Sequence, residues 1–506
     1  MPIQESNVSH AAPAPRGSRL ATLAALSGGL LAACGTPGVR GVAGTAPAPN
    51  VAWLPPASPA HEPANPTGTL LLPPDLAARV AQLQLTDVID LALRNNTATS
   101  AAWADARAAA ASYGAAKGQY YPTVALSGTA QTLKTVPSNT PVSVTRKFYG
   151  ATLTGSWLLF DFGGRSGSVG VAREALLAAD WQHNAILQNV VLAVEQGYFQ
   201  YLGTKALLAA QQTTLQESQT NLEAAEQRHK VGLATIADVL QARTARSQTR
   251  LELEATQGQL QSTRGALALS MGLPANLPYD IEVPPDTSLP LGIVEDADSL
   301  IARAVRERPD LAAQRALAKQ ARARVSVARS QALPSLSVGG NAGETSFYVD
   351  SSRSFGPYRN SYNATLTLSF PLFSGWSQVY NVKAASAAAE AAARRAQGFE
   401  QQVIYQVFNA YYGLRTATQQ VRTSRDLLAS ATESEQVALA RYKSGAGSLL
   451  DLLTAQAALA GARAQAIQAR FSWNTALAQL AHDVGILGLD GRSPLHLRPD
   501  TADTNK

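Results

Sequence analysis

The chain has 506 residues but only one cysteine and few aromatic or charged side chains. The single cysteine, Cys34, excludes a disulfide within one chain. Aromatic residues make up 6% of the sequence, while Ala, Gln and Leu dominate its middle, and this bias favours long helices over a compact mixed domain. The net charge of +6 is small for this length and no dense Lys/Arg run occurs, so nucleic acid is not indicated as a partner.

Motifs that carry catalysis are also missing from the sequence. The six histidines show no metal-ligand spacing. The sequence has no nucleophile motif, no phosphate-binding glycine loop and no metalloprotease helix. We therefore expect a protein that is not an enzyme and that needs no metal or other cofactor.

The N-terminus has the pattern of an export signal. Two arginines precede an apolar run, residues 20–33, that is too short to span a bilayer as a stable anchor. Small residues directly before Cys34 resemble the lipobox of bacterial lipoproteins, in which the cysteine is acylated, and Gly35 after it implies sorting to the outer membrane. We predict a lipoprotein signal peptide over 1–33 and a covalent lipid at Cys34, with an ordinary signal peptide as the alternative. The Pro- and Ala-rich segment 34–79 is expected to be a tether, or to lie extended along another surface.

The rest of the chain is an internal repeat. The stretch "RHKVGLATIADVLQA" at 228–242 recurs as "RYKSGAGSLLDLLTA" at 441–455, 213 residues later, and shorter matches elsewhere keep this offset to within one residue. Such a pattern predicts one architecture used twice. We assign residues 80–285 to the first copy, 293–485 to the second and 486–506 to a C-terminal tail.

Each copy is predicted to contain a helix, two strands, a long helix, a break and a returning helix. The expected segments are 85–118, 123–130, 149–159, 166–228 and 235–271 in the first copy, and 298–331, 335–341, 362–372, 377–441 and 448–482 in the second. At about 1.5 Å per residue the long helices reach roughly 95 to 100 Å, and the two shorter helices of a copy together cover nearly the same distance. We expect a long helix that leaves the membrane, a tight turn at its far end, and two shorter helices stacked on the way back.

Apolar side chains at alternating steps of 4 and 3 residues predict a coiled-coil seam on each long helix. These side chains are Leu187, Val191, Val194, Tyr198 and Tyr201 on the first long helix, and Ile404, Val407, Tyr411 and Leu414 on the second. We therefore expect each long helix to pack against its neighbours along this stripe.

The strands indicate a membrane barrel. In the second strand of each copy apolar and polar residues alternate, from Tyr149 to Leu159 and from Tyr362 to Leu372, with aromatic residues towards each end. Lipid satisfies no backbone hydrogen bonds, so strands in a membrane must close into a barrel, which four strands cannot do. Several chains are therefore expected to share one barrel. A half-buried strand in a soluble sandwich is the alternative.

These features together resemble the TolC-type outer-membrane efflux proteins, the outer-membrane factor family. The residues that carry the resemblance are Val231–Leu233 and Asp238–Val239 in the first copy, and Arg441–Tyr442, Gly445 and Asp451–Leu453 in the second. The resemblance implies an all-α protein with a membrane β-barrel part. It also implies a homotrimer in which a 12-stranded β-barrel in the bacterial outer membrane, surrounded by its lipids, continues as a long α-helical barrel across the periplasm.

The resemblance further implies the exit duct of a tripartite efflux or type I secretion system. Such a duct is docked by a periplasmic adaptor protein and supplied by an inner-membrane pump of the resistance-nodulation-division or ABC type. Acylation at Cys34 favours small-molecule efflux, of drugs or metals. The motif "VGLATIADV" is closer to members that are not lipidated, so a type I protein secretion duct is an alternative, as is a structural envelope lipoprotein without a pore.

The two repeated turn motifs would then lie at the periplasmic tip, where the family's tunnel closes. By resemblance, Asp238 and Tyr442 match positions that link neighbouring coiled coils, and Asp451 matches an acidic ring at the constriction. Gly447 stands where a well-known member has a gate-link arginine, and Thr454 replaces a second acid of the ring. The closed state is therefore expected to be held less tightly, or by other pairs.

A purely structural interpretation competes at these same positions. In each copy a Ser or Thr followed three residues later by an acid fits the capping box that begins a helix, and a glycine before it permits a turn with positive φ. These residues are the caps Thr235 and Ser448, the acids Asp238 and Asp451, and the hairpin-turn glycines Gly232 and Gly445. Capping and gating are compatible, because an acid near the tip also faces other chains.

Overall fold

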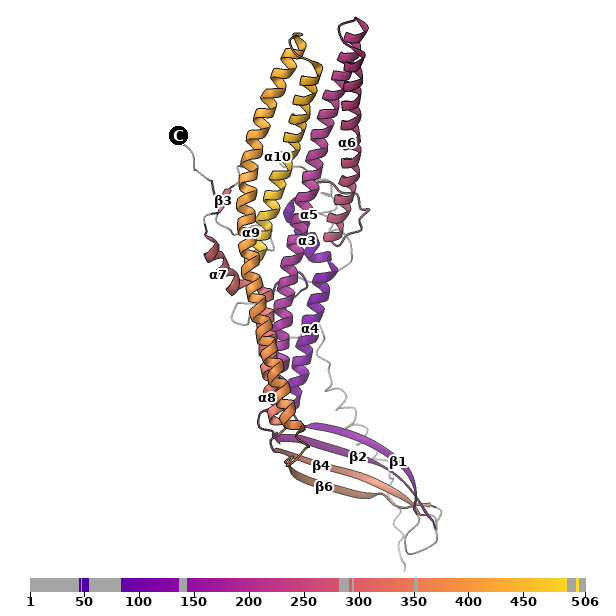
Figure 1. Ribbon diagram of the computed structural model, residues 1–506. Coiled ribbons are helices and arrows are strands. Elements are labelled where there is room, and N and C mark those ends of the chain that lie inside the picture. Colours follow the sequence, from indigo (N-terminus) through magenta and orange to yellow (C-terminus); the bar gives the residue numbers. More distant parts are fainter. Residues whose placement is uncertain are drawn as a thin grey trace, which may run out of the picture. The chain divides into compact units, whose positions relative to one another are not determined.

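The computed structural model describes residues 45–46, 48–53, 83–135, 143–281, 291–293, 295–349, 354–488 and 497–499. The predicted signal peptide, Cys34 and most of the predicted tether and tail lie outside the described residues. Within them, the predicted fold class and the order of elements in the two copies are confirmed (Figure 1). None of the helices in these ranges is both long and apolar enough to cross a membrane.

The two copies share the same order of two short helices, two long strands, a long helix and a returning helix, and each has small elements of its own. The first copy has α3 (Leu85–Asn95), α4 (Thr97–Lys117), η2 (Gly118–Tyr120), β1 (Thr123–Thr135), β2 (Val144–Phe160), α5 (Gly164–Lys230) and α6 (Ile236–Ser270). The second has β3 (Leu291–Ile293), α7 (Ala297–Glu307), α8 (Pro309–Ser330), β4 (Ser335–Val349), β5 (Ser354–Phe355), β6 (Arg359–Ser369), α9 (Ser377–Lys443), α10 (Leu449–Val484) and β7 (Leu497–Pro499). The long helices α5 and α9 have 67 residues each.

The first helix of each copy is interrupted, and the prediction of one continuous helix was wrong in both. In the first copy Asn96 has an extended backbone, and its side chain accepts the N–H of Ala98 at 2.8 Å to cap α4. In the second copy Pro309 is the first residue of α8 and leaves Arg308 extended, because proline disfavours a helical residue before it. Each break therefore has a local cause in the sequence.

In the first copy the break forms the joint between the two shorter helices. Asn96 Nδ2 donates a hydrogen bond to the carbonyl of Ser270, the last residue of α6, at 3.0 Å. Gly272 follows with φ of 73°, and a Cβ there would lie 2.6 Å from the Asn95 carbonyl oxygen. Only glycine fits this close approach, so α6 ends against the break between α3 and α4.

The second copy repeats this joint with different side chains. Arg308 is buried, binds the Asp310 carboxylate through Nε and Nη2, and donates from Nη1 to the carbonyl of Asp483 in the last turn of α10 at 3.2 Å. Gly485 ends α10 with φ of 84°, and a Cβ there would lie 3.0 Å from the Arg308 Cα. The two shorter helices thus meet at their ends along each long helix, as the sequence predicted (Figure 1).

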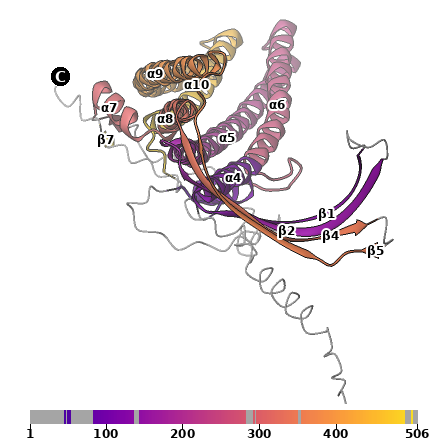
Figure 2. The same cartoon turned by 90° about the horizontal axis from the view of Figure 1, so that it is seen from below.

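The four long strands form one antiparallel, curved sheet in the order β1-β2-β4-β6, and β5 pairs with the end of β4 (Figure 2). The strands β1 and β4 extend beyond the predicted segments, to Thr135 and Val349. The predicted strand end at Leu372 was wrong, since β6 stops at Ser369 and Pro371, which has no N–H to donate, follows. Among the described residues, neither outer strand, β1 or β6, pairs with a further strand.

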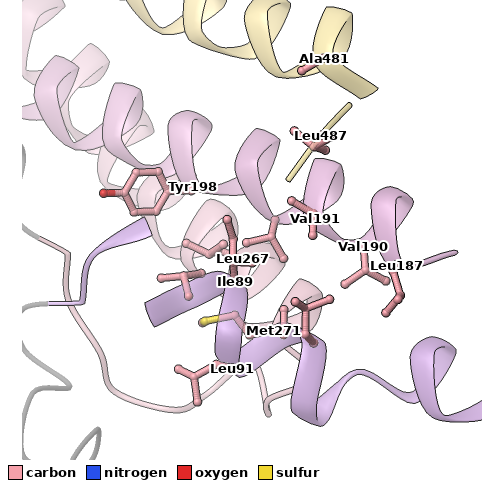
Figure 3. Close-up of a cluster of buried hydrophobic side chains, with 14 of the residues drawn as sticks. Ile89, Leu91, Leu187, Val190, Val191, Tyr198, Leu267, Met271, Ala481 and Leu487 are labelled. Carbon is pink, nitrogen blue, oxygen red and sulfur yellow. The ribbon is translucent and has the colours of Figure 1, made fainter. Parts of the chain in front are cut away.

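The hydrophobic core lies where α3, α5, α6, α7, α9 and the end of α10 meet. Figure 3 shows part of it. All five side chains of the predicted seam on α5 are buried. On α9 the predicted Val407 and Leu414 are fully buried, but Ile404 is exposed and Val403 is buried in its place. The predicted seam on α9 was therefore wrong at Ile404, where the position before it faces the core.

Candidate functional site: the sheet and the hairpin tips

One face of the sheet is apolar across its width. The register places Leu126 opposite Leu153, Leu153 opposite Ala342 and Ala342 opposite Tyr362, and this face stays apolar until Glu344 near the loop end of β4. In a single chain Leu126 is 75% exposed. An open apolar face of this extent fits contact with lipid.

The opposite face of the sheet carries small polar side chains. Its members are Ser127, Thr129, Thr152, Thr154, Asn341, Asn363, Thr365 and Thr367, which the same pairings bring together. Hydroxyl and amide groups of this kind can hydrogen-bond to water. The sheet therefore has the two unlike faces of a barrel wall, one for lipid and one for a wet lumen.

Aromatic side chains flank the apolar face at both ends of the strands. At the loop end the ring of Tyr149 lies 4.8 Å from that of Phe355 and 5.9 Å from that of Tyr358. At the helix end Phe160, close to Phe162, and Trp376 are exposed. Aromatic rings at both boundaries of an apolar band are typical of the interfaces of a membrane barrel.

At the other end of the helices, α5 turns into α6 in what we call the first hairpin. Gly232 has φ of 75°, its N–H donates to the carbonyl of His229 at 3.0 Å, and the N–H of Leu233 donates to the carbonyl of Arg228 at 2.8 Å. These two bonds form a Schellman motif, which satisfies carbonyls that the end of α5 would otherwise leave free.

The second hairpin, between α9 and α10, has the same turn. Gly445 has φ of 79°, its N–H donates to the carbonyl of Tyr442 at 3.2 Å, and the N–H of Ala446 donates to the carbonyl of Arg441 at 2.9 Å. Both turn glycines thus occupy a backbone conformation that side chains with a Cβ rarely adopt.

Each return helix begins with a complete capping box. The N–H of Asp238 donates to Thr235 Oγ1 at 3.2 Å, and the N–H of Thr235 donates to Asp238 Oδ2 at 2.8 Å. The corresponding distances for Ser448 and Asp451 are 3.1 and 3.2 Å. Hydrogen bonds from Ser448, with a smaller contribution from the charge of Arg441, hold the pKa of Asp451 below its ordinary value.

Gly447 packs tightly against the end of α9. Its N–H donates to the carbonyl of Arg441 at 3.0 Å, and a Cβ at this position would lie 3.1 Å from the Arg441 Cβ. The turn therefore has little space for a larger residue at position 447.

Tyr442 links the two hairpins of one chain. It is only 8% exposed and belongs to an apolar cluster, the tip cluster, with Leu222, Ala225, Val239 and Ala242 from the first hairpin and Leu449 and Leu452 from the second. The Arg228 guanidinium carbon lies 4.3 Å from the centre of the Tyr442 ring, and Arg228 Nη2 donates to the Tyr442 carbonyl at 3.2 Å. The sequence did not single out Arg228, although it opens the repeated motif.

The hydrogen bonds of the Asp238 side chain in the structure lie within its own capping box. Its carboxylate accepts the N–H and the hydroxyl of Thr235, and its N–H donates to that hydroxyl. Among the described residues, the structure thus brings Tyr442 to Arg228 and gives no hydrogen bond between Tyr442 and Asp238.

A second group of polar side chains is buried on α5, away from the tip. Burial raises the pKa of Asp180 to about 8, and neither carboxylate oxygen has a hydrogen-bond partner within the described part of the chain. His183 Nε2 lies 3.0 Å from the Val51 carbonyl oxygen, and burial lowers its pKa. Asn184 bonds both the N–H and the carbonyl of Trp53, at 2.6 and 2.7 Å. The described part of the predicted tether therefore lies along α5.

A cavity of about 740 Å³ lies between α5, α6 and α10. Its lining is mainly Gln, Thr, Ala and Phe, with no ionisable acid or base. Within the described ranges no three His, Cys, Asp or Glu side chains come close enough together to hold a metal ion. The polar and apolar groups that the structure does assemble lie instead at the two faces of the sheet and at the hairpin tips.

Comparisons with known proteins agree with this geometry. Protein CyaE of Bordetella pertussis is 29% identical over 436 residues, which cover 83% of this chain and 88% of that protein. The toluene efflux pump outer membrane protein TtgC of Pseudomonas putida is 25% identical over 409 residues, 79% of this chain and 82% of that one.

The fold is also that of solved outer-membrane channels. The structure of the outer-membrane channel OprN matches with a TM-score of 0.72 at 21% identity, over 80% of this chain and 90% of that chain. The family model for outer membrane efflux proteins matches residues 88–273 and again residues 300–485, one match in each copy. The resemblance predicted from the turn motifs and the duplication is confirmed: the chain belongs to the outer membrane efflux protein family.

Proposed function

We propose that three copies of this chain form the outer-membrane exit duct of a tripartite efflux system. The observation that carries the proposal is the four-stranded sheet with one apolar face, one Ser/Thr/Asn face and two outer strands that pair with no further strand among the described residues. Such edges are not viable in lipid, so β1 of one copy must pair with β6 of the next. Three copies would supply 12 long strands, within the range of about 8 to 26 known for such barrels.

The long helices support the same assembly. Large apolar side chains on α9 and α6 are exposed in a single chain, among them Tyr405, Phe408, Tyr412 and Leu251. An exposed apolar surface on a helix favours a protein partner, and neighbouring copies would cover it in a closed ring of helices. The same association of three copies is thus expected to complete both the membrane barrel and the ring of helices in the periplasm.

The proposed mechanism is passive conduction. A pump in the inner membrane supplies the energy, a periplasmic adaptor docks on the hairpin tips, and substrates pass through the tunnel and the Ser/Thr/Asn-lined barrel to the outside. The gate is proposed to lie at the tips, where three copies of Asp451 would form an acidic ring. A family relative is named as part of a toluene efflux pump, which favours small molecules as cargo. A lipid at Cys34 would add an anchor in the outer membrane.

The direct test is to measure the size and the conductance of purified full-length protein. We expect a trimer in detergent and discrete single-channel currents in planar bilayers. A monomer without channel activity would overturn the proposal and leave a structural envelope lipoprotein. Deleting the gene and measuring both drug and metal susceptibility and the secreted proteins would separate small-molecule efflux from type I protein secretion.

Two substitutions test individual residues of the proposal. Asp451→Ala should lower cation selectivity or cation block of the channel, and unchanged selectivity would leave only the capping role. Cys34→Ser should abolish labelling by a radioactive or clickable fatty acid. Labelling that persists would contradict acylation at this cysteine.

A further inference from the structure

By resemblance a gate-link arginine would stand at Gly447, whereas in this structure another arginine, Arg228, joins the two hairpins. We infer that Arg228 holds the second hairpin against the first and so acts as the gate link of this chain. The inference rests on the proposed function, because a link at the tip regulates passage only if the chain forms a duct. It assigns the linking role to an arginine of the first hairpin, since position 447 of the second hairpin is a glycine.

The geometry of Arg228 gives it two kinds of contact with α9. Its guanidinium stacks over the ring of Tyr442 at 4.3 Å, and Nη2 donates to the Tyr442 carbonyl at 3.2 Å and to the Lys443 carbonyl at 3.5 Å. These carbonyls belong to the last turn of α9, which carries partial negative charge, and the Tyr442 carbonyl accepts the Arg228 bond in addition to that from the N–H of Gly445. A cation is therefore favoured at this place for two independent reasons.

The surroundings of Tyr442 strengthen the contact. Arg228 itself is half-buried, and Tyr442 packs in the tip cluster with side chains from both hairpins. A cation–π contact gains strength when water is excluded from the ring. Separation of the hairpins would expose this ring and remove the guanidinium from it in the same step.

Of the two arginines that open the repeated motifs, only Arg228 reaches the other hairpin. Arg441 occupies the place in the second hairpin that Arg228 has in the first, but its Nη2 reaches the Ala446 carbonyl of its own turn, at 3.4 Å. His229, the counterpart of Tyr442, is exposed and its Nδ1 lies 3.0 Å from the Ala234 carbonyl oxygen of its own hairpin. The link between hairpins therefore depends on the pair of Arg228 and Tyr442.

The first experiment compares Arg228→Gln with its matched control, Arg441→Gln, in the full-length protein. Both changes remove one positive charge from the end of a long helix. We expect Arg228→Gln to shorten the closed, low-conductance dwell times in planar bilayers by about tenfold, the effect of losing about 1.4 kcal/mol. Arg441→Gln should leave these dwell times within about twofold of wild type. Equal dwell times for Arg228→Gln and wild type would overturn the inference.

A second pair of variants identifies which part of Tyr442 is used. Tyr442→Phe keeps the ring and should keep the closed dwell times, whereas Tyr442→Leu removes the ring and should shorten them as Arg228→Gln does. Combining Arg228→Gln with Tyr442→Leu should add little, because each change breaks the same contact. If Tyr442→Phe alone opens the channel, the hydroxyl makes the link, by a bond such as one to Asp238, and the inference is wrong.

Hydrogen exchange gives a readout that does not depend on channel activity. Arg228→Gln should speed amide exchange in the last turn of α9, residues 439–443, about tenfold, while Arg441→Gln should not affect the last turn of α5. Wild-type protein without any current would contradict the proposed duct, yet this exchange result would still stand. Exchange at 439–443 that is unchanged by Arg228→Gln, in protein that remains trimeric, would overturn the link itself.

Discussion

The first and second hairpins have the same backbone and use their side chains differently. In each hairpin the long helix ends in a Schellman motif and the return helix begins with a capping box. At equivalent positions, however, Ile236 is 58% exposed where Leu449 is 3% exposed, and His229 is exposed where Tyr442 is buried. The two copies thus share the backbone of the turn, but equivalent side chains differ in whether they are buried. The second hairpin buries Tyr442 and Leu449 in the tip cluster, whereas the first leaves their counterparts His229 and Ile236 exposed.

This difference has a consequence for movement at the tip. The second hairpin contributes Tyr442, Leu449 and Leu452 to the tip cluster, so its position depends on contacts with the first hairpin. The first hairpin leaves Val231 and Leu233 exposed next to its turn. A partner that covers these side chains could therefore act on one hairpin, and the other would respond through the tip cluster and Arg228.

The largest expected effect comes from cutting one apolar side chain in each hairpin at the same position of the repeat. Leu449→Ala should destabilise the packing of the second hairpin by about 2 to 4 kcal/mol, because it leaves a cavity in the tip cluster. Ile236→Ala should change this packing by less than about 0.5 kcal/mol, because Ile236 lies outside the tip cluster and is 58% exposed in a single chain. Hydrogen exchange of the tip peptides in the two variants measures both values.

The control for this comparison is the trimer itself. Both variants should keep the wild-type mass and the wild-type exchange rates in the core around Leu187, far from the tip. If Ile236→Ala loosens the tip as much as Leu449→Ala does, the two hairpins are packed alike and the proposed difference between them is wrong.

A second comparison concerns the same place on the two long helices, where α5 has Asp180 and His183 and α9 has Ala393 and Ala396. Burial raises the pKa of Asp180 from 3.8 to about 8, so the folded chain binds this proton more tightly than the unfolded chain. The free energy of unfolding is then highest below about pH 4 and falls as the pH rises towards about 8. Asp180→Asn, which cannot ionise, should gain about 1 to 2 kcal/mol over wild type at pH 8 and little at pH 4.

Apparent melting temperatures of the purified trimer at pH 4, 6 and 8 measure this effect. Ala393→Asn is the matched variant on α9 and should show the pH dependence of wild type, because Asp180 remains. An equal difference between Asp180→Asn and wild type at all three pH values would show that Asp180 does not titrate in the folded chain.

The sequence predicted the repeated parts of the fold and missed what depends on one particular copy. Periodicity and turn chemistry are local, so the long helices, the alternating strands and the capping boxes could be predicted from neighbouring residues. The break at Asn96 was missed because Asn is also tolerated inside a helix, and Pro309 was not taken as the helix start that it is. Arg228 was missed because its partner lies 214 residues away, and two matching motifs do not show which side chain reaches across.

The last comparison, in which the two hairpins should not differ, tests the turn that they share. Gly232→Ala and Gly445→Ala each place a Cβ on a residue with positive φ and open space around it, so each should cost about 1 to 2 kcal/mol, and the two costs should be equal. Gly447→Ala is the comparison, because φ there is not positive and any cost would come instead from the new Cβ, 3.1 Å from the Arg441 Cβ. Exchange rates of the turn amides measure all three. A cost at Gly445 well above that at Gly232 would mean that packing in the tip cluster also holds the second turn. The two turns would then not be equivalent.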